Sequence, residues 1–138
     1  MKLLSLKSYK IPCIIEEKEQ GILRVFELNH LPFQVERVFT IVNAFSGSLR
    51  GEHAHKKCNQ LLCCVSGEVK LVCDDGNKQI EIVLNPKSEA ILVPNGIWAE
   101  QKYLKDKSVL MVFCDQSYDE SDYIRDYQEF LNWKNRQI

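Results

Sequence analysis

Short runs of alternating apolar and polar residues follow one another along most of the chain, and such runs predict β-strands. Turn residues separate them: Ser66-Gly67, the two-residue hairpin signal Asp75-Gly76, and Asn85-Pro86. Besides a strand that carries a histidine pair, the expected strands cover residues 10–16, 21–28, 35–42, 60–65, 68–74, 79–84, 90–93 and 109–114. Many short strands with no helical pattern before the end predict a closed or sandwiched antiparallel β fold.

The spacing of apolar residues changes from a strand pattern to a helical pattern near the C-terminus. Ser117 to Glu120 matches a helix capping box, and four apolar side chains follow at helical spacing: Tyr123, Tyr127, Phe130 and Leu131. The pattern predicts an α-helix over about 119–135, which packs through its aromatic stripe on the strands or on a neighbouring subunit. The length of 138 residues predicts one domain over 1–138, with the strands over about 8–116.

Composition excludes several classes of protein. A net charge of −1 argues against a broad nucleic-acid-binding surface. No apolar run is long enough for a signal peptide or a membrane span, so we expect no membrane partner. The six cysteines lack a Cys-x-x-Cys pair, which predicts reduced, buried thiols in the cytoplasm in place of disulfides or a structural zinc.

His53 and His55 stand one residue apart, so on a strand both imidazoles leave the same face. The order is glycine, five residues, His-x-His, four residues, Gln60, six residues, glycine. This spacing resembles the first motif of the cupins, and Pro94-Asn95-Gly96 resembles the start of the second. The resemblance implies an all-β fold, a cupin-type double-stranded β-helix (jelly-roll barrel) with a C-terminal α-helix.

The metal ligands of a cupin are incomplete here. Gln60 stands where the first motif usually has a carboxylate, and Ala99 where the second has a histidine. Two imidazoles, an amide and a methyl group make a poor metal site, because most sites need three or four protein ligands. We therefore expect no metal and no cofactor, and imidazoles that are free for proton transfer. Glu52 and Glu100 are the nearby carboxylates that a metal-dependent alternative would need.

Several segments together resemble the sugar-nucleotide 3,4-ketoisomerases that act on dTDP-4-dehydro-6-deoxyglucose: RVFTI, RGEHAHKK, DDGN, IWAE and SYDESDYIRDYQEF. The resemblance implies a metal-independent homodimer that moves a keto group from C4 to C3 for 3-amino-deoxysugar and polysaccharide biosynthesis. It also implies that His53 and His55 are catalytic. Relatives often have a tyrosine where this chain has Phe39 and Thr40, and some have a histidine in place of Ala99.

The chemistry of the histidine pair fits this reaction. A ketone at C4 acidifies the proton on C3, and removal of that proton gives an enediolate that can be reprotonated at C4. Histidine, with an ordinary pKa of about 6.5, can act as both base and acid near neutral pH. We hypothesise that His55 moves the carbon-bound proton and that His53 serves the oxygens.

Side chains must also hold the substrate, since the sequence has no glycine loop that could cradle phosphates. Arg50 and Arg37 are candidates for binding the pyrophosphate, with Lys57 as a weaker one, because guanidinium and ammonium groups pair with phosphate oxygens. Arg37 also fits a packed position at the rim of the sheet. Other expected contacts come from the strand positions and from analogy with the second cupin motif: Gln60, Trp98, Glu100 and Tyr103. A structural role remains open for each of them.

Two other functions stay open at this point. One is a non-catalytic cupin module that binds a sugar nucleotide or another small ligand through the histidine pair. The other is a metal-dependent oxygenase or isomerase. The isolated His30, in a loop beside Pro32, is expected to be structural.

Overall fold

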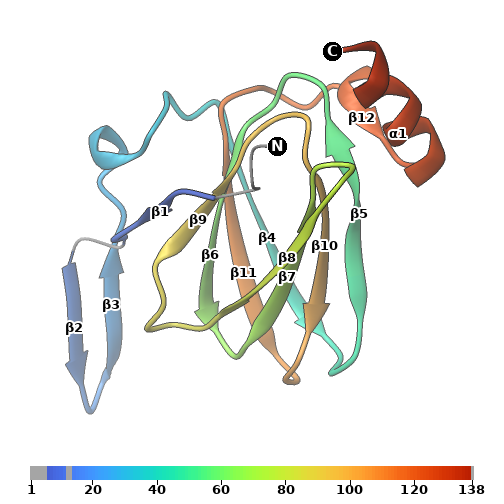
Figure 1. The fold of residues 1–138 in the computed structure, drawn as a ribbon. Coiled ribbons are helices and arrows are strands. Elements are labelled where there is room, and N and C mark those ends of the chain that lie inside the picture. Colours follow the sequence, from blue (N-terminus) through green and yellow to red (C-terminus); the bar gives the residue numbers. More distant parts are fainter. Residues whose placement is uncertain (1–5, 12–13, 138) are drawn as a thin grey trace.

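A computed structural model of the chain describes residues 6–11 and 14–137. Two antiparallel sheets of five strands face each other (Figure 1). The first has the order β1 (Ser8–Tyr9), β9 (Ala90–Val93), β6 (Gln60–Ser66), β11 (Ser108–Cys114) and β4 (Arg37–Ala44). The second has the order β12 (Tyr123–Ile124), β5 (Leu49–His55), β10 (Trp98–Tyr103), β7 (Val69–Asp74) and β8 (Gln79–Leu84).

The remaining described elements lie outside this sandwich. A hairpin of β2 (Ile14–Lys18) and β3 (Gly21–Val25) projects away from the two sheets (Figure 1). Two short 3₁₀ turns, η1 (Leu28–His30) and η2 (Glu120–Asp122), and one α-helix, α1 (Tyr127–Arg136), complete the set. Among the described residues, no helix is long and apolar enough to cross a membrane.

Side chains from both sheets meet in the space between them and form the main core. Leu62 of β6, Leu71 of β7 and Val112 of β11 are almost completely buried there. Successive side chains of a strand point to opposite faces, so each of these strands supplies every second residue to the core. The alternating pattern in the sequence is therefore the direct cause of the sandwich.

The expected strands are present, with shifts of at most three residues at their ends. The first of them, over 10–16, is replaced by β1 and β2, and residues 12–13 lie outside the described part. The Asp75-Gly76 hairpin does join β7 to β8, but its loop has four residues, 75–78, because Asp74 pairs with Gln79. The Asp75 side chain stabilises this longer loop by accepting from the backbone N–H groups of Asn77 and Lys78.

The tail differs from the helix expected over 119–135. The capping residues near Asp119 begin only the η2 turn, and Tyr123–Ile124 then pairs with β5 as strand β12. The helix starts at Tyr127, where the Asp126 carboxylate accepts a hydrogen bond from the Glu129 backbone N–H. A second capping sequence, Asp126 to Glu129, thus begins the helix, and the preceding residues are free to join the sheet.

Candidate active site

A cavity of about 280 Å³ opens between the two sheets. It is small beside typical ligand pockets of about 300–1,000 Å³, and its wall is strongly polar. Its lining comes from β4, β5, β6, β10, β12 and the residue after β12: Phe39, Thr40, Ile41, Arg50, Gly51, His53, Gln60, Gln101, Tyr123 and Arg125. Three residues that the sequence predicted for the site therefore line the same cavity: Arg50, His53 and Gln60.

The two histidines of β5 lie together, as expected for residues on one face of a strand. Their ring centroids are 4.9 Å apart and the rings are nearly perpendicular. Tyr123 packs on both, with its ring centroid 5.0 Å from that of His53 and 4.3 Å from that of His55. His53 lines the cavity, whereas His55 is buried, with 5% of its surface exposed. His53 is thus the imidazole that a ligand in the cavity meets first.

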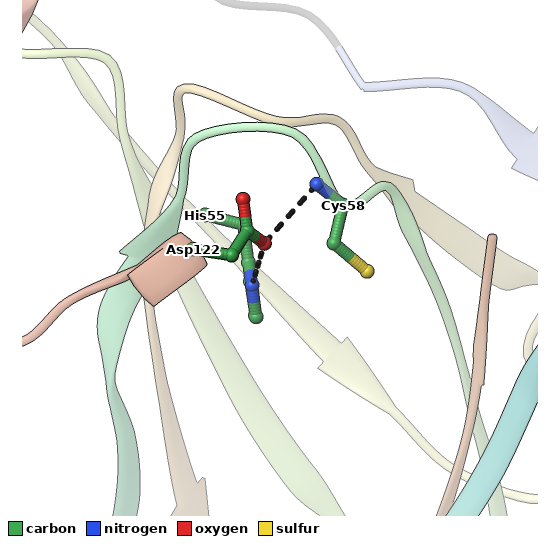
Figure 2. Close-up of side chains that lie close together, drawn as sticks. All are labelled: His55, Cys58 and Asp122. Atoms are coloured by element: carbon green, nitrogen blue, oxygen red, sulfur yellow. Dashed lines mark hydrogen bonds and ion pairs between the residues drawn. The ribbon is translucent and has the colours of Figure 1, made fainter. Parts of the chain in front are cut away.

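The carboxylate of Asp122, which does not line the cavity, holds the His55 ring. Its Oδ2 atom lies 2.9 Å from His55 Nδ1 (Figure 2). The same carboxylate accepts backbone N–H bonds from Lys57 at 2.6 Å and from Cys58 at 3.3 Å. One side chain of η2 therefore fixes both the His55 ring and the turn that follows β5.

Both imidazoles are neutral at physiological pH. Burial lowers the pKa of His53 to about 3, and the neighbouring His55 and Arg125 lower it further. Burial also lowers the pKa of His55, although the hydrogen bond to Asp122 opposes this shift. Since a carboxylate only accepts hydrogen bonds, the neutral His55 ring carries its hydrogen on Nδ1. Its basic nitrogen is Nε2, which is buried and without a hydrogen-bond partner.

A β-bulge brings Arg50 to the cavity. Arg50 and His53 are three residues apart, so a regular strand would point them to opposite faces. Along β10, however, Ala99 pairs with His53 and Gln101 with Arg50, so β5 has one extra residue in this interval. Gly51, with φ of +76°, takes up that residue, and a Cβ there would lie 2.9 Å from the Gln101 side chain.

Two further guanidinium groups surround Tyr123. Arg37 Nη1 lies 3.4 Å from the Tyr123 hydroxyl oxygen and donates to it. The Arg125 guanidinium lies 4.3 Å from the Tyr123 ring centroid and is paired with Glu120. Arg50 and Arg125 line the cavity and give it a cationic wall, whereas Arg37 acts on it through the Tyr123 hydroxyl.

Gln60 is held by a thiol at the floor of the cavity. Its Nε2 atom donates to Cys114 Sγ at 3.6 Å. The neighbouring Cys58 side chain lowers the pKa of the Cys114 thiol to about 7, and Gln60 and Arg37 act in the same direction. The amide of Gln60 is thus oriented by the polar cluster below it.

Besides His55, five residues that the sequence predicted for the site are absent from the lining of this cavity: Trp98, Glu100, Tyr103, Lys57 and Arg37. The Trp98 ring packs against Tyr127 and Phe130 of α1, and its Nε1 atom donates to Glu100. Tyr103 is fully buried in the core, with its hydroxyl donating to Gln101. The Lys57 side chain is exposed, and only its backbone N–H serves the site. Trp98 and Glu100 lie outside the cavity because successive side chains of a strand point to opposite faces. Ala99 faces inward, so its two neighbours face the helix.

Four residues of the site were not predicted from the sequence: Gln101, Asp122, Tyr123 and Arg125. The last three lie in the segment that was expected to be helical, where an aromatic stripe indicates packing. The capping sequence from Asp126 to Glu129 could have indicated that the helix starts at Tyr127 and that the residues before it form another structure. Gln101 follows Ala99 by two residues, and strand parity alone places it inward.

The site does not fit the metal of a cupin. Among the described residues, His53 belongs to no cluster of three or more His, Cys, Asp or Glu side chains that could bind an ion. One such cluster exists beside it, His55, Cys58 and Asp122, with ligand atoms within 4.8 Å of one another (Figure 2). Its donors are already engaged, because the carboxylate accepts three N–H bonds and the Cys58 thiol donates to the Asn59 carbonyl.

The facing antiparallel sheets, the His-x-His strand and the cavity between the sheets define a cupin-like fold. The chain matches the model of the FdtA family (WxcM-like, C-terminal) over residues 5–135, and it belongs to this family.

Proteins of known activity resemble the chain over most of its length. The TDP-4-oxo-6-deoxy-alpha-D-glucose-3,4-oxoisomerase of Aneurinibacillus thermoaerophilus is 34% identical over 119 residues, which are 86% of each chain. The crystal structure of QdtA, a sugar 3,4-ketoisomerase from Thermoanaerobacterium thermosaccharolyticum in complex with TDP, has a TM-score of 0.83 and 29% identity over 97% of this chain and 96% of that one. A 3,4-ketoisomerase from Helicobacter canadensis has a TM-score of 0.81 and 29% identity, covering 95% of this chain and 96% of that one.

The low pKa of His53 predicts a loss of stability in acid. The unfolded chain binds a proton at His53 below about pH 6.5, but the folded protein excludes that proton until about pH 3. Between pH 7.5 and 5.0 this difference removes about 1–2 kcal/mol of the free energy of unfolding. Urea unfolding measures this difference. Between pH 7.5 and 5.0, the free energy of unfolding of His53→Asn should fall by about 1–2 kcal/mol less than that of the wild type. Equal losses in both proteins would contradict the low pKa.

Proposed function

We propose that the protein is a metal-independent sugar-nucleotide 3,4-ketoisomerase, which moves the keto group of a dTDP-4-keto-6-deoxyhexose from C4 to C3. One observation carries this proposal: the cavity presents a neutral imidazole, that of His53, beside a cationic and hydroxyl-bearing wall. The lone pair of an unprotonated imidazole is free to accept a proton, and the cations stabilise the negative charge of an enediolate. The relatives named above carry out this type of reaction.

His53 is the base that moves the carbon-bound proton. It takes the proton from C3, and the C–H electron pair then forms a double bond between C3 and C4. The imidazolium returns the proton at C4 after the second ketone begins to form. Because His53 lines the cavity and His55 lies behind it, this assignment reverses the roles hypothesised from the sequence.

His55 and Asp122 support the base from behind. The carboxylate fixes the tautomer of His55, so the Nε2 lone pair stays on the side of the ring away from Asp122. Burial keeps His53 unprotonated, and a proton on either imidazole would disfavour a proton on the other. The pair thus acts as a unit in which His53 meets the sugar.

Arg50 is the group that we assign to the pyrophosphate. It reaches the cavity through the Gly51 bulge, and it forms no ion pair with any described residue. Phosphate oxygens supply the partner that a guanidinium prefers. Gln60, on the opposite sheet, is placed to bond a sugar hydroxyl, whereas Arg37 acts on Tyr123.

The isomerase is tested by proton NMR of dTDP-4-keto-6-deoxyglucose in heavy water. We expect the wild-type protein to exchange the C3 hydrogen for deuterium and to form the 3-keto sugar. His53→Asn should lose both activities by about 10²-fold or more, because the base is removed. His30→Asn, which changes an exposed histidine of η1, serves as the control and should behave as the wild type. A binding module would hold the sugar without any exchange.

Asp122→Asn tests the support of the histidine pair. The amide presents N–H groups as well as an oxygen, so it no longer fixes the hydrogen of His55 on Nδ1. We expect kcat to fall about 10²-fold with a small change in KM, and the pH profile of kcat to shift. Asp119→Asn, at an exposed cap of η2, is the matched control. An unchanged kcat and pH profile in Asp122→Asn would show that the carboxylate is structural only.

We also propose that the enzyme is a cytoplasmic homodimer. The five described cysteines are free and buried, as is usual in a reducing compartment. The β2–β3 hairpin pairs only within itself, and its Ile22 and Leu23 are about half exposed (52% and 53%). Strand β4 is an open sheet edge that exposes Val38 and Val42. Exposed apolar residues beside unpaired strand edges are typical of a surface that a second copy covers.

Light scattering after size-exclusion chromatography tests the dimer. The wild-type protein should have twice the mass of one chain. The double change Ile22→Lys and Leu23→Lys should shift it to the monomer, because two ammonium groups would have to be buried. Val83→Lys, at an exposed position of β8 in the other sheet, is the control and should leave the dimer intact. A double variant that stays dimeric would exclude the hairpin from the interface.

A further inference from the structure

The reaction needs a second proton carrier, which the histidine pair does not supply. When the ketone moves, the C4 oxygen gains a proton and the C3 hydroxyl loses one. His53 is occupied by the carbon-bound proton, and His55 lies buried behind it. A group on the cavity wall must therefore exchange protons with two neighbouring oxygens.

The cavity wall offers few groups that can do so. Arg50 and Arg125 stay protonated at every relevant pH, and the amides of Gln60 and Gln101 neither give up nor take a proton. Strand β4 contributes Phe39 and Thr40, so it supplies no phenol. The lining then leaves Tyr123 and the aliphatic hydroxyl of Thr40, which is the weaker acid of the two types of hydroxyl.

Tyr123 is held for this role by its neighbours. Its ring packs on both imidazoles, with centroid distances of 5.0 and 4.3 Å. Arg37 donates to its hydroxyl oxygen at 3.4 Å, so the phenolic hydrogen is free to point to another acceptor. With Arg37 at the oxygen and Arg125 over the ring, two cations face the negative charge that develops when the hydrogen leaves.

We propose that Tyr123 is a further catalytic residue, whose hydroxyl carries the proton between the C4 and C3 oxygens of the sugar; this inference rests on the proposed isomerase function. His53 first removes the C3 proton; the C–H electron pair forms the C3–C4 double bond and the C4 carbonyl electron pair moves to its oxygen. This oxygen then takes the Tyr123 proton. The phenolate then takes the proton of the C3 hydroxyl, whose electron pair forms the new carbonyl. The double-bond pair takes the proton of His53 at C4, and both side chains return to their starting forms.

This relay predicts that hydrogen exchange and ketone transfer can be separated. In Tyr123→Phe the ring still packs on the imidazoles and the base is intact, so the C3 hydrogen continues to exchange with heavy water. Formation of the 3-keto sugar should fall about 10²-fold, with KM changed less than about threefold. The ratio of C3 exchange to product should therefore rise at least about tenfold over that of the wild type.

Two further variants make the test specific. Arg37→Gln keeps the phenol but removes its cationic donor, and it should raise the same ratio by a smaller factor. Tyr127→Phe removes a hydroxyl that bonds Asp74 outside the cavity, and its ratio should equal that of the wild type. Circular dichroism and thermal unfolding establish that each variant is folded.

The outcomes separate the relay from the isomerase itself. If wild-type protein makes the 3-keto sugar but Tyr123→Phe keeps the wild-type ratio, the relay is wrong and the isomerase stands. The same conclusion follows if the rates of C3 exchange and of 3-keto sugar formation are both unchanged. It also follows if both rates fall together, which is expected if the Tyr123 ring only packs the site. If wild-type protein neither exchanges nor converts the sugar, the isomerase and the relay both fall.

Discussion

The carboxylate of Asp122 is the point on which the site depends. It accepts hydrogen bonds from the His55 ring and from the backbone N–H groups of Lys57 and Cys58. Hydrogen bonds to a charged acceptor contribute about 1.5–3 kcal/mol each, so three of them hold the η2 turn firmly against the end of β5. This attachment explains why residues 120–124 run beside β5 as turn and strand rather than as the start of the helix. It also places Tyr123 directly over both imidazoles.

Burial then decides the chemistry of the histidines. An exposed histidine pair beside three guanidinium groups would change charge with small changes of pH. Inside the sandwich, desolvation holds the pKa of His53 near 3 and lowers that of His55, so both rings stay neutral. The buried Nε2 atom of His55 has no hydrogen-bond partner, and such an acceptor costs about 1–3 kcal/mol. The fold tolerates this cost beside His53, the imidazole that we propose as the base.

Most of the sandwich could be predicted from the sequence, because strand patterning is local. The run from Gln60 to Val65 lies in a buried strand, and the histidine pair shares one face as its spacing requires. The helix start could not be chosen between two capping sequences without knowing that Asp122 bonds the turn after β5. The charge of Arg50 predicted a role in binding phosphate. Its inward direction, however, depends on the bulge at Gly51, which cannot be predicted from the alternation of side chains along a regular strand.

The same parity explains which cupin features survive in this chain. Ala99 pairs with His53 across β5 and β10, so the missing ligand of the second cupin motif leaves only a methyl group beside the base. Gln60, on the other sheet, is engaged with the Cys114 thiol. A cation at this position would have two neutral nitrogens and little else to bind. The cationic wall of Arg50 and Arg125, with Arg37 at the Tyr123 hydroxyl, supplies positive charge of another kind, fixed by the protein and directed at oxygens that become negative during the reaction.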